Sequence, residues 1–100
     1  MNAFLTDPAA IRARQLAGFA RAKRNSLAAA IEALDEVGLH SSAVALRVTP
    51  PEAMQEVLAG ARAILCEMMV TSTDRTPRVI AGYETALGAV TTAWSWSVMS

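Results

Sequence analysis

Hydrophobic side chains recur every three or four residues along most of the chain, a spacing that predicts helices with one buried face each. In residues 8–37, the apolar positions that share one side of a helical wheel are Leu16, Phe19, Leu27, Ile31, Leu34 and Val37. Asp7 is placed as an N-cap, and Pro8 suits the first helical position. Gly38 is a C-terminal stop. We expect one long helix up to this glycine, although the Asn25-Ser26 pair leaves open a division into two helices.

The segment after Gly38 is ambiguous. Within residues 41–48, Val44, Leu46 and Val48 recur at every second position, as apolar side chains do in a half-buried strand. No second segment of the chain offers a strand to pair with it, and a lone strand cannot satisfy its backbone hydrogen bonds. We therefore expect a short helix here, capped by Ser41 or Ser42.

Two further helices are expected where a threonine stands directly before proline. Thr49 precedes two prolines, and Glu52 is placed to complete a capping box. Up to about Val70, the apolar positions at helical spacing are Met54, Val57, Leu58, Ala61, Ile64, Leu65, Met68 and Met69. Thr76 and Pro77 start the last helix by the same logic. Its main apolar stripe is Ile80, Tyr83, Leu87, Val90, Trp94 and Val98.

The predicted elements describe an all-α fold, a small bundle of three to four helices with a long first helix. A chain of 100 residues makes one domain, which we place at residues 8–100 after a flexible N-terminus at residues 1–7. The composition is 53% hydrophobic, which is too apolar for a disordered chain. The longest uncharged run, residues 85–100, is too short for a bilayer-spanning helix of about 20 residues, so we expect no membrane span.

Candidate chemistry is sparse. Cys66 is the only cysteine, which excludes a disulfide within the chain and a cysteine-pair metal site. Since no signal peptide is visible at the start, we expect a reducing, cytoplasmic location. His40 follows a helix stop, and nothing near it orders a catalytic triad. Glu32 and Glu36 lack the Glu-x-x-His pattern of helical metal sites. We therefore expect no catalytic residue, no metal, no cofactor and no enzymatic activity.

The first predicted helix carries charge of one sign. Residues 11–25 hold five cations and no acid, namely Arg12, Arg14, Arg21, Lys23 and Arg24. Arg14, Arg21 and Arg24 lie toward the polar side and are our candidate partner-binding residues, whereas Arg12 and Lys23 fall among the apolar positions. Because the five cations do not form one stripe, we favour a solvated or ion-paired helix face over a nucleic-acid interface. A nucleic-acid-binding accessory protein is the alternative, and steep salt dependence would distinguish it.

The last predicted helix has a second stripe, made of small residues. Gly82, Ala86, Ala89 and Ala93 recur at helical spacing, with Trp96 at the flank. Small side chains let another helix approach closely. An apolar stripe left exposed marks an interface, and two-fold pairing is the commonest way to cover one. We therefore predict a homodimer through these five residues, against the alternative of a central helix in a monomer.

These observations favour a small regulatory, adaptor or inhibitor protein that acts by binding another protein. Lys23 is the only lysine among nine basic residues, and alanine is abundant. Such a composition is typical of high-GC bacterial or phage coding sequences. A phage or mobile-element origin is therefore our expectation, while the identity of the partner is not readable from the sequence.

Overall fold

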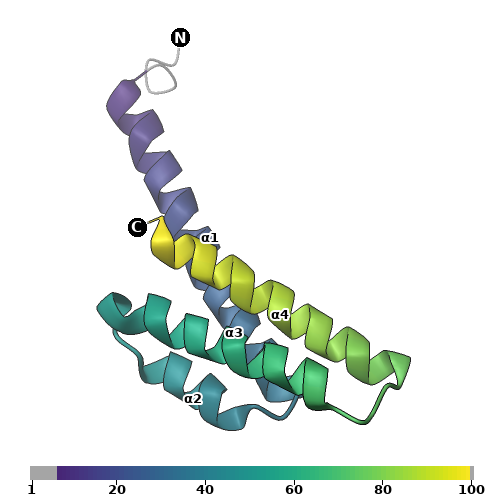
Figure 1. Cartoon of the computed structure of the whole chain (residues 1–100). Helices are drawn as coiled ribbons and strands as arrows, with labels where there is room; N and C mark the ends of the chain where they lie inside the picture. The colour runs from purple at the N-terminus through teal and green to yellow at the C-terminus, as the bar shows by residue number, and fades with distance from the viewer. Residues whose placement is uncertain (1–6, 100) are drawn as a thin grey trace.

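The structure, a computed structural model, describes residues 7–99 and is built of helices (Figure 1). Its elements in chain order are α1 (Pro8–Glu36), α2 (His40–Val48), the 3₁₀ turn η2 (Pro51–Ala53), α3 (Met54–Thr71) and α4 (Pro77–Val98). No strand occurs within residues 7–99, so the predicted small all-α bundle is confirmed. Of the N-terminus predicted to be flexible, residues 1–6 lie outside the described part of the chain.

α1 is one continuous helix of 29 residues, which confirms the long first helix. Asp7 Oδ1 accepts a hydrogen bond of 3.0 Å from the backbone N–H of Ala9, as expected of an N-cap. At the other end Gly38 has φ +87°, a left-handed conformation that glycine adopts without strain. The backbone N–H of Leu39 then donates to the carbonyl of Leu34 at 2.9 Å, which closes a Schellman motif.

The predicted caps of the next two helices are wrong. α2 already begins at His40, with Leu39 as N-cap and no side-chain capping bond, so neither Ser41 nor Ser42 caps it. Thr49 does not cap α3 either, because its hydroxyl donates to the carbonyl of Ala45.

The paired prolines explain the late start of α3. A residue before proline is pushed out of the α region, and Pro50, which precedes Pro51, is extended with ψ 157°. The chain therefore makes a 3₁₀ turn first and becomes α-helical only at Met54.

α4 begins at Pro77, as predicted, but the hydroxyl of Thr76 makes no capping bond. Both the hydroxyl and the backbone N–H of Thr76 donate to Asp74 Oδ1, at 2.6 Å and 3.0 Å. These two donors stabilise the charged carboxylate and hold the pKa of Asp74 below its ordinary value. Asp74 thus orders the turn that leads into α4.

The core lies where α4 packs against α1 and α3, and α2 also packs against both α1 and α3 (Figure 1). Its buried residues are Ala30, Ala33, Leu34, Ala43, Leu46, Leu58, Ala61, Leu65, Ala86, Val90 and Ala93. Six of these eleven are alanines, so the helices approach closely and the core is thin. Within residues 7–99, no helix is both long and apolar enough to cross a membrane.

The first half of α1 extends beyond the bundle (Figure 1). The molecule measures 63 × 29 × 17 Å along its principal axes, and this extension accounts for its elongated shape. Residues 8–21 are exposed except for Ala10, which is half-buried. We call this segment, residues 8–21, the arm.

Candidate protein-binding site

The arm displays apolar side chains on the face that the bundle buries lower down. Leu16 is 60% exposed and Phe19 is 55% exposed. Residues three or four apart share a helix face, so this stripe continues through Leu27 to Ala30 and Leu34, both fully buried. The arm therefore carries the core-facing stripe of α1 past the point where the bundle can cover it.

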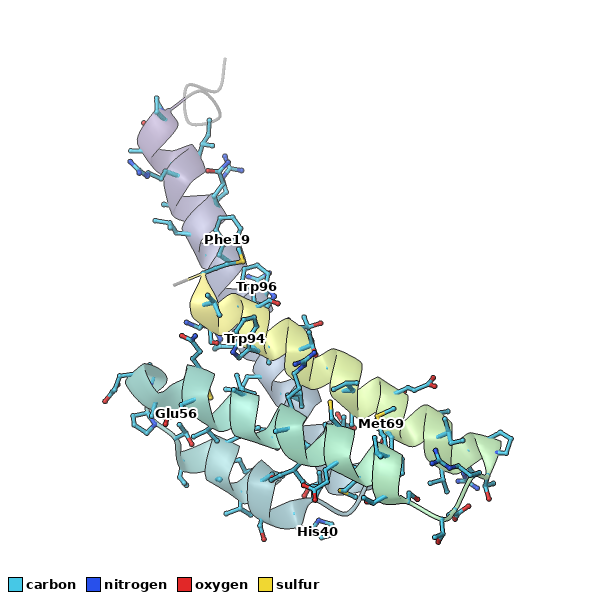
Figure 2. All side chains as sticks on the ribbon, in the orientation of Figure 1. Phe19, His40, Glu56, Met69, Trp94 and Trp96 are labelled. Atoms are coloured by element: carbon cyan, nitrogen blue, oxygen red, sulfur yellow. The ribbon has the colours of Figure 1, made fainter. Side chains whose placement is uncertain are left out.

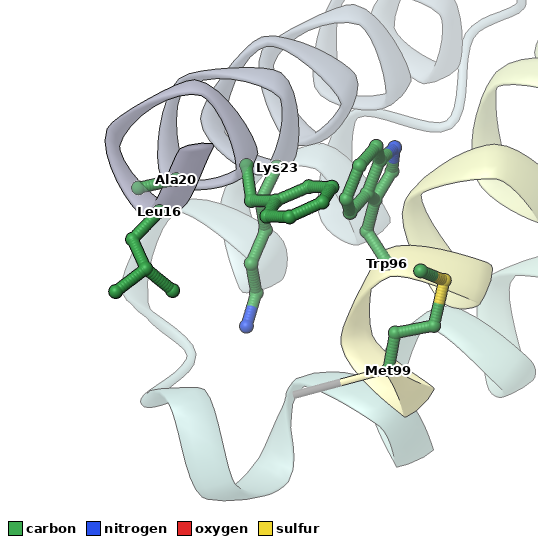
Figure 3. A pocket seen from close by; sticks show the side chains of 6 residues that line it. Leu16, Ala20, Lys23, Trp96 and Met99 are labelled. Atoms are coloured by element: carbon green, nitrogen blue, oxygen red, sulfur yellow. The ribbon is translucent and has the colours of Figure 1, made fainter. Parts of the chain in front are cut away.

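A hollow of about 360 Å³ lies between the arm and the C-terminal end of α4 (Figure 3). The residues that line it are Leu16, Phe19, Ala20, Lys23, Trp96 and Met99. The rings of Phe19 and Trp96 are in tilted contact, with centroids 5.9 Å apart, and join the two helices at one wall (Figure 2). On the opposite sides lie Leu16 and Met99, and the amino group of Lys23 points into the space between them (Figure 3).

A second hollow continues from the first toward the start of α3. Lys23 lines both hollows, and Arg24, Leu27, Met54 and Ala93 are among the other residues around the second. The two hollows share Lys23 as a lining residue. We call the two hollows together the arm groove.

The arm groove carries positive charge. Lys23 and Arg24 line it, and within residues 7–99 no acidic side chain does. Arg14, Arg21 and Arg24, the predicted contact residues, are all exposed on α1, but only Arg24 reaches the groove. Lys23, which falls among the apolar positions of the helical wheel, was not one of the predicted contact residues. Its position on the stripe was the signal that could have identified it.

The reasoning that led to the small-residue dimer interface is corrected by the structure. We supposed that the stripe has no cover within so short a chain, and α1 of the same chain covers it. The five residues are placed as follows: Ala86 and Ala93 are buried in the core, while Gly82, Ala89 and Trp96 are half-buried. A Cβ at Gly82 would lie 3.6 Å from Val37 Cγ1, and Trp96 contacts Phe19. A 29-residue helix is long enough to run along α4, which the wheel alone could not reveal.

His40, the only histidine, belongs to a surface cluster that joins α1 to α2. Its Nδ1 donates to Asp35 Oδ1 at 3.0 Å, and Arg47 donates to Asp35 Oδ2 at 2.9 Å. The hydrogen bond from His40, and then that from Arg47, lower the pKa of Asp35 below its ordinary value. Within residues 7–99, no three His, Cys, Asp or Glu side chains group as a metal site would require. The cluster thus ties the end of α1 to both the first and the last turn of α2.

No known family model, curated protein or solved structure matches this chain. A function is therefore argued from the arm groove, its exposed apolar residues and its charge.

Proposed function

We propose that this protein is a non-enzymatic regulator, adaptor or inhibitor that acts by binding another protein through the arm groove. The observation that carries the proposal is the exposure of Leu16 and Phe19 on the same stripe that is fully buried at Leu34. Contiguous exposed apolar surface marks interaction sites on proteins of this size. A helix that lies in an apolar groove is one of the recurring modes of protein recognition.

The arm contributes no residue to the buried core. Within residues 7–99 the buried core begins at Ala30, well after the arm ends. Full burial of a leucine or phenylalanine side chain contributes about 1.5–3 kcal/mol. Because Leu16 and Phe19 are 60% and 55% exposed, the isolated chain gains only part of this free energy. A partner that covers these two side chains would gain the remainder.

The wider setting follows from composition. A single cysteine fits a reducing compartment, so we place the protein in the cytoplasm. The arginine- and alanine-rich composition supports a phage or mobile-element source. The homodimer stays a prediction that light scattering checks.

The proposal is tested by affinity capture from the native cell with three forms of the full chain. Wild type is compared with Leu16→Glu in the groove and with Val70→Glu, a control at an α3 position that is 76% exposed. We expect a specific protein to be retained by wild type and by Val70→Glu and to be lost with Leu16→Glu, because a carboxylate in an apolar interface is strongly unfavourable.

Two results would count against the proposal. One is that Leu16→Glu retains the same protein as wild type, which would place the binding surface elsewhere. The other is that nucleic acid is retained in place of protein, with retention that falls steeply as salt is added.

A further inference from the structure

We infer that the occupant of the arm groove is an acidic amphipathic helix of the partner protein. The inference rests on the proposed function, since it names the chemistry of the partner for the same groove. It is carried by the shape of the groove and by the sign and placement of the charges around it.

The shape of the groove suits a helix. Its walls come from two helices, with Leu16 and Phe19 on α1 and Trp96 and Met99 at the end of α4. Side chains of a third helix fit between two packed helices, as ridges fit into grooves. A partner helix here would extend the bundle along the arm and would cover the side chains that the arm leaves exposed.

The charges around the groove have one sign. α1 contains no acid before Glu32, and the chain carries no charge after Glu84. Lys23 and Arg24 line the two hollows, and within residues 7–99 no acid does. A partner surface of opposite sign would associate faster and be selected over others.

The spacing of these charges specifies the partner further. Arg12 stands four residues before Leu16, and Lys23 stands four residues after Phe19. All four positions share one helix face, so two cations bracket two apolar side chains. The complementary helix has two apolar side chains three or four residues apart, with an acid one turn before and one turn after them.

A second copy of this chain is a poorer occupant. If two arms paired antiparallel about the midpoint between Leu16 and Phe19, the register would place Arg12 of each copy opposite Lys23 of the other. That arrangement repeats the same like-charge contact at both ends of the interface, which disfavours it. Nucleic acid complements the cations, but its phosphates offer no apolar surface to cover Leu16 and Phe19.

The experiment uses the full chain and two synthetic helical peptides, followed by titration calorimetry. Both peptides carry two leucines at the spacing described, and they differ only in having glutamates or lysines one turn before and after the leucines. We expect the glutamate peptide to bind about tenfold or more tightly than the lysine peptide. Equal binding by the two peptides, tighter binding of the lysine peptide, or no binding of the glutamate peptide would overturn the inference.

Charge reversal on the protein tests whether this groove is the site. With Arg12→Glu and Lys23→Glu together, the preference should switch to the lysine peptide, whereas the control Arg78→Glu, at the first turn of α4, should leave it unchanged. If the double variant does not fold, Arg12→Glu alone is used for the same comparison, because Arg12 is exposed and its substitution should not disturb folding. If the double variant, or Arg12→Glu alone, still binds the glutamate peptide more tightly than the lysine peptide to the same extent as wild type, the inference is overturned.

Two further results separate this inference from the proposed function. If the native partner is lost with Leu16→Glu while the glutamate peptide fails to bind, the proposed function stands and the acidic helix is wrong. If a mixed-sequence DNA duplex binds more tightly than the glutamate peptide at physiological salt, the occupant is nucleic acid and both are wrong.

Discussion

The two halves of α1 carry the same apolar periodicity in opposite environments. In the bundle half, Ala30 and Leu34 are fully buried, whereas in the arm Leu16 and Phe19 are more than half exposed. The helix itself does not change, and the difference lies in what packs against it (Figure 1). An amphipathic stripe therefore predicts a buried face without saying whether the cover comes from the same chain.

The two regions also differ in their charges. The bundle half of α1 carries the acids Glu32, Asp35 and Glu36, of which Asp35 is paired with His40 and Arg47. The arm and the residues that follow it up to Ile31 carry only cations. An apolar surface with charges of one sign suits a partner of the opposite sign.

The largest expected effect is the difference in unfolding free energy between alanine variants of Leu34, in the bundle, and Leu16, in the arm. Leu34→Ala should lower the free energy of unfolding by about 2–5 kcal/mol, because it leaves a cavity in the core. Leu16→Ala should change it by less than about 0.5 kcal/mol, because the side chain is exposed in the free protein. Urea unfolding of both variants measures the difference. Similar losses for both would show that the arm is part of the folded core.

A smaller effect tests whether α1 covers α4 within one chain. Ala86 is fully buried in the core, so Ala86→Leu should overpack it and destabilise by about 1–3 kcal/mol. Ala81→Leu, at an exposed position on the same helix, is the matched control and should be nearly neutral. Thermal unfolding at two protein concentrations checks both variants. A midpoint that depends on concentration in the wild type would instead place a second copy in the fold.

Replacing glycine by alanine should change the free energy of unfolding by about 1 kcal/mol at the end of α1 in the bundle, but not in the arm. Gly38→Ala should destabilise by roughly that amount, because φ +87° strains any residue with a Cβ. Gly18→Ala in the arm meets nothing within 4 Å, so it should raise helix content without moving the unfolding midpoint of the bundle. Circular dichroism reports both quantities. A large shift of the midpoint with Gly18→Ala would couple the arm to the bundle.

The smallest effect is a dependence on pH. Because the pKa of Asp35 is lowered in the folded state, its pairing stabilises the protein above the ordinary aspartate pKa near 3.8 and is lost as pH falls through the folded value. Asp35→Asn should therefore be less sensitive to acid than wild type, as followed by unfolding between neutral and acidic pH. Asp74, whose pKa is lowered in the same direction, still titrates in the variant and preserves part of the slope. An unchanged acid dependence would contradict a folded-state role for the Asp35 pairing.

Much of the architecture could be predicted from local signals. Asp7 before Pro8, and Gly38 after the last apolar position, bound α1 because caps and left-handed glycines act within a few residues. The expected cap at Thr49 was wrong for a local reason as well, since Pro51 holds the preceding Pro50 in an extended conformation and so delays the start of α3.

The candidate site was less predictable, because it depends on distant neighbours. The wheel placed Arg12 and Lys23 on the apolar side of the first helix, which is the side of the groove. It could not show that Trp96 meets Phe19 from the other end of the chain. For the same reason it could not show that Gly82 lies against Val37 of α1.

Hydrogen exchange of the free chain, and of the chain with the glutamate peptide, tests the contrast between the two halves of α1 most directly. In the free chain, amides of residues 8–21 should exchange much faster than those around Leu34, because a helical segment without tertiary packing opens readily. The peptide should slow exchange in the arm and at the end of α4 and leave the amides of α2 unchanged. Arm amides as well protected as the core in the free chain, or peptide protection confined to the bundle, would contradict the assignment of the arm groove as the binding surface.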